Sequence, residues 1–182
     1  MISRWCGAMK LRELEAALQN AQLADIVLVG FVDHSQQLAR FRALLDAVYL
    51  EFDGIFLEIA TIRDTGRARI GIVAEPRIRA ELDDDMTPAI SSVRQQVLRD
   101  PDARNALREV RLWEVAEAQD QLSCAALSFE LDNGQSVFLD PFNHFGIRIG
   151  GDEHNALWLA SATRGGLART DLTLRAGQPG KI

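Results

Sequence analysis

The segment from Ser123 to Gly150, SCAALSFELDNGQSVFLDPFNHFGIRIG, carries two apolar runs on either side of Asn133-Gly134. Side chains alternate between the two faces of a strand, so a slip of one residue in the pairing exposes a whole apolar face. A two-residue turn would mix the faces, whereas a three-residue loop at 132–134, with Gly134 left-handed in a bulge, keeps one face apolar. We therefore predict a β-hairpin in which Phe129 faces Val137 and Leu127 faces Leu139, while Phe138 lies on the other face beside Ala126.

A third run follows this hairpin. Asp140-Pro141 has proline where a type I turn prefers it. Phe145, Ile147 and Ile149 then alternate with Gly146 and Arg148, which is typical of a half-buried strand. We expect the three runs to form a β-meander.

Residues 48–74 predict a second β-meander. Asp53-Gly54 favours a two-residue type I′ turn, because both of its central positions need positive φ. A four-residue loop at 63–66 then keeps the same face apolar through the third strand. The predicted partners are Phe52 with Ile55, Leu50 with Leu57, Val48 with Ile59, Ile59 with Ile70 and Leu57 with Ile72.

Helical spacing of apolar residues marks three further segments. Residues 11–23 form an amphipathic pattern, and residues 38–48 repeat it behind Ser35, although a loop leading into the next strand is the alternative there. Thr87-Pro88 resembles a helix start, and this helix would end before Pro101. Strands are predicted at 26–32 and 110–115. The expected class is α+β: antiparallel β-meanders in one sheet, with a strongly curved form of that sheet as an alternative, and two to three helices packed on it.

The 182 residues suit one domain. We expect a single α+β domain over 1–161, with residues 1–8 dispensable because Met9 directly precedes a helical pattern; Met1 and Met9 both stay open as native starts. Residues 162–182 are rich in Gly, Arg and Thr and are expected to be a mobile or loosely attached tail, with a short strand at 171–174 as the alternative. The sequence contains no internal repeat, although the two meanders share one strand-turn-strand pattern.

Composition argues against several partners. The net charge of −6 repels a phosphate backbone, so no nucleic acid is expected. No run approaches the roughly 18 apolar residues of a membrane helix, so no membrane is expected either. The two cysteines, Cys6 and Cys124, fit no metal or redox spacing and agree with a reducing cytoplasm. We expect a cytoplasmic protein without a cofactor.

One polar cluster in the sequence resembles a site. It consists of Asp140, Asn143, His144, Asp152, Glu153 and His154. His144, Asp152 and His154 offer nitrogen and oxygen ligands for a divalent ion, but their spacing matches no ligand signature. The favoured interpretation is that His144 completes the Asp-Pro turn and the second group lies on a solvated loop. The sequence contains no nucleophile elbow and no phosphate-binding loop, so no catalytic residue is predicted.

Two tryptophans complete the candidates. Trp158 lies among apolar residues and is expected in the core. Trp113 alternates with charged neighbours, and for it the core and an interface are equally open, since tryptophan offers a large contact area. The interaction candidates are Trp113, Asp140, Asn143 and His144.

The segments LEFDGIFLEIATIRDTG (50–66) and VFLDPFNHFGIRIGG (137–151) together resemble small bacterial α+β domains of the uncharacterised or immunity-protein type. This resemblance implies a cytoplasmic bacterial protein that binds another protein through an acidic surface. The predicted function is a non-catalytic protein-interaction module, immunity-like or accessory. The alternatives are a small metal-assisted hydrolase that uses His144, His154 and Asp152, and a homodimer joined through a sheet edge or Trp113.

Overall fold

The computed structural model describes residues 9–35, 38–118, 121–142, 144–161 and 167–174. Strands take 52% of the described residues and helices 13%, and the strands form two antiparallel sheets. The prediction of an α+β fold with one sheet is therefore wrong, and the protein is mostly β. The elements are α1 (Leu11–Leu18), β1 (Leu23–Asp33), β2 (Arg40–Phe52), β3 (Ile55–Ile62), β4 (Arg67–Val73), β5 (Met86–Ser92), α2 (Arg94–Val97), β6 (Leu107–Trp113), β7 (Ala116–Ala118), β8 (Gln121–Cys124), β9 (Ala126–Leu131), β10 (Ser136–Asp140), β11 (Arg148–Gly150), α3 (Asp152–Ala160) and β12 (Arg169–Thr173).

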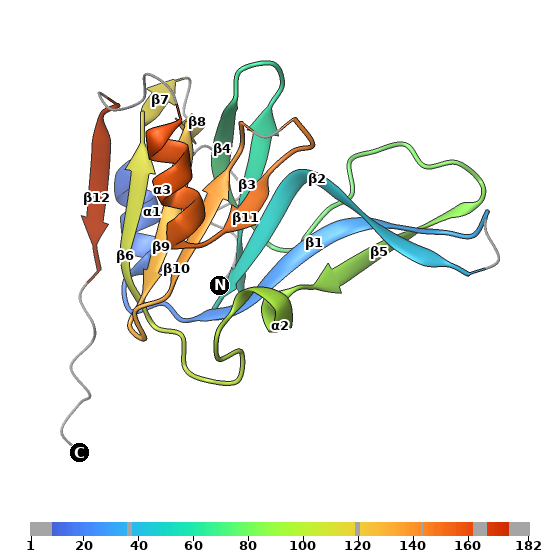
Figure 1. Ribbon diagram of the computed structural model, residues 1–182, viewed down its shortest axis with the longest axis horizontal. Helices are drawn as coiled ribbons and strands as arrows, with labels where there is room; N and C mark the ends of the chain where they lie inside the picture. The colour runs from blue at the N-terminus through green and yellow to red at the C-terminus, as the bar shows by residue number, and fades with distance from the viewer. Residues whose placement is uncertain (1–8, 36–37, 119–120, 143, 162–166, 175–182) are drawn as a thin grey trace.

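The two sheets enclose one apolar core. The seven-stranded sheet has the order β5-β1-β2-β3-β4-β8-β7, and the five-stranded sheet has the order β11-β10-β9-β6-β12. Inner side chains of both sheets, such as Leu50 and Phe129, belong to the same buried cluster, which also takes in Leu14 and Leu18 of α1. α3 lies on the opposite side of the five-stranded sheet from α1 (Figure 1).

All of the predicted strand registers are confirmed. β2 and β3 pair Phe52 with Ile55 through Val48 with Ile59, and Asp53 and Gly54 both have positive φ as a type I′ turn requires. β3 and β4 pair Ile59 with Ile70 and Leu57 with Ile72. β9 and β10 pair Phe129 with Val137 and Leu127 with Leu139, and Gly134 has φ +77° in the three-residue loop. Turn chemistry and face alternation together determined these registers.

Two predicted helices are strands instead. Most of the predicted helix 38–48 belongs to β2, which begins at Arg40 and whose register against β1 shifts between Leu28 and Gly30. The core face of β2 first takes every second residue: Phe41, Ala43 and Leu45. After the register shift the next core residue is Val48, which is three positions beyond Leu45. This change of phase imitates helical spacing, which explains the error.

The segment after Thr87 is β5 rather than a helix, and only Arg94–Val97 is helical. Val93 N–H donates to Ile26 O and His34 N–H donates to Asp85 O, so the residues of β5 that bond to β1 are the odd-numbered ones. Pro88 therefore faces the outer edge of the sheet, where its missing N–H costs no ladder bond. The first helix is also shorter than expected, and α3 was not predicted.

The two halves of the chain share one topology, an internal structural repeat that the sequence itself does not show. Each half begins with a helix, α1 or α2, and continues as four antiparallel strands and a fifth strand that returns to pair with the first. The spatial orders are β5-β1-β2-β3-β4 and β12-β6-β9-β10-β11. Even the irregularities match, because β1 shifts register between Leu23 and Asp25 and β6 shifts between Leu107 and Glu109.

The outer faces of the two sheets are covered differently. On the seven-stranded sheet, the segment after β4 packs over Tyr49: the Tyr49 hydroxyl lies 2.9 Å from Glu58 Oε1 and 2.9 Å from the Arg77 carbonyl oxygen. Arg79 donates to both Glu58 oxygens at 2.7 and 2.8 Å. On the five-stranded sheet this place is taken by α3. The same sheet topology therefore presents two different outer surfaces.

Part of the segment expected to be a loosely attached tail is strand. β12 pairs with β6, and Leu172 and Leu174 are buried in the shared core. Among the helices of the described residues, none has the length and apolar character needed to cross a bilayer.

Candidate functional site

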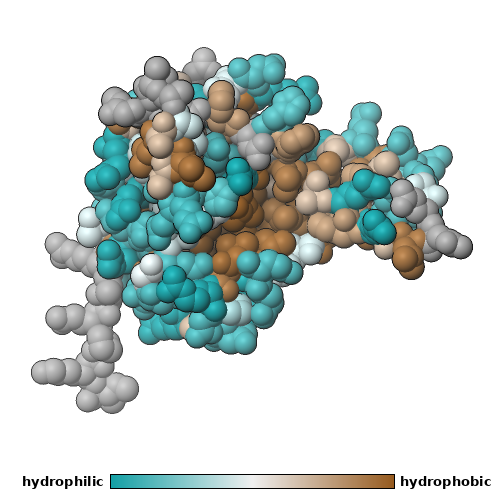
Figure 2. All heavy atoms as spheres, viewed as in Figure 1, coloured by the Kyte–Doolittle hydropathy of each residue, from teal (hydrophilic) through white to brown (hydrophobic). Residues whose placement is uncertain are grey.

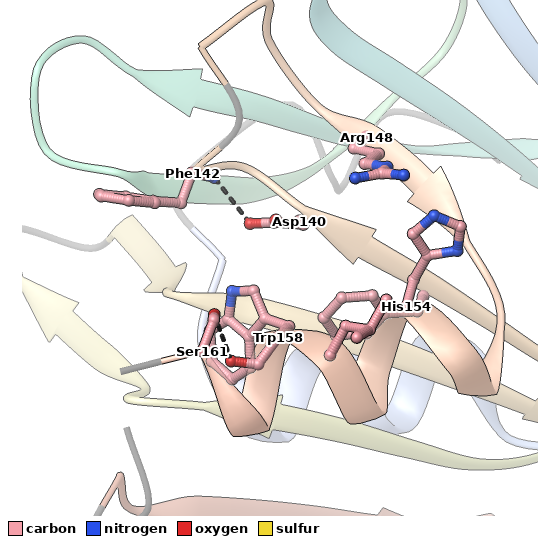
Figure 3. A pocket seen from close by; sticks show the side chains of 8 residues that line it. Asp140, Phe142, Arg148, His154, Trp158 and Ser161 are labelled. Atoms are coloured by element: carbon pink, nitrogen blue, oxygen red, sulfur yellow. Dashed lines mark hydrogen bonds between the residues drawn. The ribbon is translucent and has the colours of Figure 1, made fainter. Parts of the chain in front are cut away.

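A surface hollow with convergent polar groups lies where α3 packs on β10 and β11 of the five-stranded sheet. We call it the aromatic hollow; its volume is about 440 Å³ and its lining residues are Phe138, Asp140, Phe142, Arg148, His154, Leu157, Trp158 and Ser161. Strands β10 and β11, the connection between them, and α3 each contribute side chains (Figure 3). Concave, partly apolar sites with a few polar groups are the usual places for recognition.

Aromatic packing builds the floor of the hollow. Trp158 of α3 lies 5.8 Å from Phe138 and 5.6 Å from Trp113 between ring centroids, and Trp113 lies 5.8 Å from Phe138. These rings form a cluster with Ala126 on the face of the sheet away from the main core. Edge-to-face and tilted pairs at these distances are favourable, so the floor is a rigid apolar surface.

The rim of the hollow carries charge. Asp140 and Arg148 occupy opposite positions on β10 and β11. Asp140 Oδ1 accepts the Phe142 N–H at 2.9 Å, which holds the turn in place (Figure 3). The Arg148 side chain is exposed and forms no ion pair or hydrogen bond with any described residue. Its guanidinium is therefore available to a ligand.

His154 forms the other side of the rim. It lies so close to Gly150 that a Cβ at that position would come within 2.5 Å of the imidazole ring. Glycine at position 150 thus lets α3 approach β11. Leu157 and Phe142 flank the opening and are 67% and 62% exposed, respectively, so exposed apolar surface borders the hollow.

Phe142 also borders a second, shallower hollow between the β10–β11 connection and the β3–β4 turn. This hollow has a volume of about 360 Å³, and Thr61, Asp64, Pro141 and His144 are among its lining residues. The Phe142 ring packs against Gly66, where φ is +64°. A contact between residues of the two halves therefore positions Phe142.

The residues predicted from the sequence have different locations. Asp140 lines the aromatic hollow, His144 lines the second hollow, and Asn143 lies outside the described residues. Trp113 is only 3% exposed and supports the hollow from beneath, so it is not a surface contact. Trp158 is buried as expected.

The three proposed metal ligands are not brought together. His154 lines the aromatic hollow, His144 lines the other one, and Asp152 lines neither. Within the part of the chain that the structure describes, no three His, Cys, Asp or Glu side chains are grouped to hold a metal ion.

Sequence reasoning missed Phe138, Arg148 and Leu157 as parts of one site. Phe138 and Arg148 are placed by the strand alternation that was predicted, but the helix that covers them was not. Residues 156–159 read ALWL, a consecutive apolar run without the three- and four-residue steps that indicate a surface helix. Asp152 and Glu153 in the first turn were the remaining signal for a helix start.

The hollow offers binding groups rather than a reaction centre. Ser161 Oγ donates to the Trp158 carbonyl oxygen at 3.0 Å, so the hydroxyl proton is not directed at His154. Cys124 lies elsewhere, in the core, where burial raises the pKa of its thiol to about 12. A thiol of this kind is inert as a nucleophile at neutral pH.

No protein-family model, no curated protein and no solved structure matches this chain.

Proposed function

We propose that the protein is a non-catalytic interaction module, immunity-like or accessory in role, that binds another protein in the cytoplasm. The partner docks on a face consisting of the aromatic hollow and the exposed side chains of Phe142 and Leu157, which we call the docking face. A single observation carries this proposal: the rigid aromatic floor is flanked by large apolar side chains that are exposed to solvent. Interface hot spots have this arrangement of a pocket that accepts an apolar anchor from the partner.

The charges of the rim favour one kind of partner. Asp140 accepts a hydrogen bond from the Phe142 N–H, whereas the Arg148 guanidinium has no partner among the described residues. Arginine binds carboxylates in a bidentate geometry, and this contact strengthens when water is excluded. We propose that the partner inserts an apolar side chain into the hollow and places an acidic group against Arg148.

The proposed location rests on the cysteines. Cys124 is a buried free thiol, and the chain has only one other cysteine. Low cysteine content without a disulfide framework is typical of proteins in a reducing compartment.

Affinity capture with a matched pair of variants tests the docking face. Leu157→Asp places a charge at the opening of the hollow, whereas Leu159→Asp makes the same change on α3 at a residue that does not line it. We expect the wild type and Leu159→Asp to retain one stoichiometric protein from a lysate of the source cells and Leu157→Asp to lose it. Equal retention by both variants would refute the docking face, and the absence of any stoichiometric protein would refute the module.

A further inference from the structure

A second surface lies away from the docking face, on a three-stranded arm. The arm consists of Gly30–Asp33 of β1, Arg40–Asp46 of β2 and Met86–Ala89 of β5, and it projects from the body of the protein (Figure 1). Residues 40–43 of β2 pair with β1 on one side only, because the pairing of β2 with β3 begins at Ala47. The arm therefore has an open strand edge along β2.

The internal repeat shows what occupies the equivalent edge in the other half. There, the β6–β9 hairpin extends beyond the body as β7 and β8. β8 pairs with β4 at Cys124–Ala68, Ser123–Arg69 and Leu122–Ile70. In the first half, the β1–β2 hairpin extends as the arm, but among the described residues it shares only one backbone hydrogen bond with the segment that precedes β11, from the Ile147 N–H to Leu45 O at 2.6 Å. The second half thus has a strand pairing, β8 with β4, whose equivalent is missing along the arm of the first half.

Backbone groups on the β2 edge are available for pairing. In an antiparallel sheet, the backbone groups of successive residues point to opposite neighbouring strands. Ile26 and His34 bond to the β5 side, so the even-numbered residues of β1 face β5. The odd-numbered residues Phe31 and Asp33 therefore bond to β2. Their partners are Arg42 and Arg40, which leaves the N–H and C=O groups of Phe41 and Ala43 pointing away from β1. No described residue bonds to them.

The opposite edge of the arm is protected. Pro88 offers no N–H along the outer edge of β5, and the Met86 N–H donates to Asp83 O at 2.9 Å. Natural sheets block strand addition by such devices. Only the β2 edge of the arm lacks them.

The core side of the arm is apolar and incompletely covered. Phe41 is 37% exposed and lies over Gly30, where a Cβ would come within 2.9 Å of its ring. Val32 and Ala43 beside it are half-buried. Figure 2 shows apolar surface running along the arm into the body of the protein. A strand added at β2 would cover part of this surface.

We infer that the β2 edge of the arm, from Arg40 to Leu44, binds an extended segment of another protein as an added β-strand, with apolar side chains at alternate positions. Main-chain bonds to Phe41 and Ala43 supply affinity, and alternate side chains pack beside Phe41. In the second half β4 occupies the equivalent edge in cis: it pairs with β8 and directs Ala68 and Ile70 into the core. The inference goes beyond the proposed function, because no residue of the docking face carries it.

A second copy of this chain is the less suitable occupant. Antiparallel pairing of two such edges would bring Arg40 and Arg42 of one copy against those of the other. Asp33 offsets only Arg42, with which it forms a 2.9 Å ion pair. Like charges opposite one another destabilise a strand pair, so the edge favours a different protein.

A phage-displayed library of linear dodecapeptides, selected on the full chain, provides the probe. Ala43→Pro removes a free-edge N–H, and the matched control Ile90→Pro removes one from the β5 edge; neither N–H belongs to the ladder with β1. We expect enriched peptides with alternating apolar residues that bind Ala43→Pro at least tenfold more weakly than the wild type and bind Ile90→Pro within twofold. On the wild type, bound peptide should slow amide hydrogen exchange at Phe41 and Ala43, a readout that does not depend on how well the variant folds.

Several results would overturn the inference. They are the absence of enriched peptides, unchanged exchange at Phe41 and Ala43, or a dimer in light scattering that Ala43→Pro dissociates. Peptides that Leu157→Asp displaces and Ala43→Pro does not would also overturn it, because they would occupy the docking face. The experiment therefore distinguishes failure of the strand site at β2 from failure of the proposed docking face.

Discussion

Gln22 and Ala106 form an isolated antiparallel bridge at the point where the two halves of the chain meet. On either side of it, the Leu23 N–H donates to Asn105 O and the Leu107 N–H donates to Ala21 O, both at 2.9 Å. Leu23 and Leu107 each begin the first strand of a half, so the two bonds are equivalent. The halves are joined by an approximate two-fold relationship, and differences between them show where the protein has specialised.

The hairpin turns of the two halves should respond alike to substitution. Gly54 and Gly134 have φ of +84° and +77°, and a Cβ at either position would meet no neighbouring atom. Alanine there is disfavoured by backbone strain alone, so Gly54→Ala and Gly134→Ala should each lower the free energy of unfolding by about 1 kcal/mol. Gly71→Ala is the control, since that glycine has an ordinary φ and open space, and urea unfolding should show no loss for it. A loss at Gly71 equal to the others would contradict this explanation.

The ion pair between Arg79 and Glu58 should hold the segment that covers the seven-stranded sheet. Glu58 is buried, and Arg79 supplies its closest cation at 2.7 Å. Arg79→Met should lower the free energy of unfolding by about 1–2 kcal/mol, because a buried carboxylate loses most of its compensation while Arg69 stays at 3.6 Å. Arg63→Met, at an exposed turn, should change it by less than about 0.5 kcal/mol. Equal effects of the two substitutions would refute the role of the pair.

The single tyrosine provides a pH test of the same region. Burial, together with Glu58, raises the pKa of Tyr49 to about 12. Since the folded-state pKa lies above the unfolded value near 10, stability is complete below about pH 10 and is lost as the pH rises towards 12, by roughly 2–3 kcal/mol. Tyrosinate absorbance should titrate near pH 12 in the folded protein, and Tyr49→Phe should remove this part of the alkaline loss. Titration near pH 10 without unfolding would contradict it.

The buried thiol makes a third region testable. Cys124 is fully buried, and burial raises the pKa of its thiol to about 12. In a Cys6→Ser background, we expect no reaction with a disulfide reagent at pH 8 until denaturant is added, and then one equivalent. Rapid reaction of the folded protein would show that the core around β8 opens.

The hairpins could be predicted from sequence because local chemistry determines them. Asp53-Gly54 and the 132–134 loop select turn types, and alternation of apolar residues then selects the register. The assignment of 38–48 failed because the register shift in β2 puts Leu45 and Val48 three residues apart on one face. A bulge accommodates the curvature of the whole sheet, so the local pattern of apolar residues does not predict where it occurs.

The candidate site could be predicted only in part. Asp140 follows from its turn, and the separation of Phe138 from the main core follows from alternation. The grouping of these residues with Arg148 and Trp158 depends on α3, which packs on the sheet through Trp158 rather than through a periodic stripe. Likewise, the internal repeat is carried by topology and bulge position, and not by residue identity.

Site-specific photo-cross-linking in the source cells tests the docking face most directly. A photoreactive phenylalanine analogue at position 157 is compared with one at Arg12, an exposed residue of α1. We predict that position 157 cross-links to one partner protein through a short segment containing an acidic residue, that position 12 does not, and that Arg148→Glu lowers the yield at least tenfold. Cross-links of equal yield at both positions, or a yield at 157 that Arg148→Glu leaves unchanged, would contradict the proposed function.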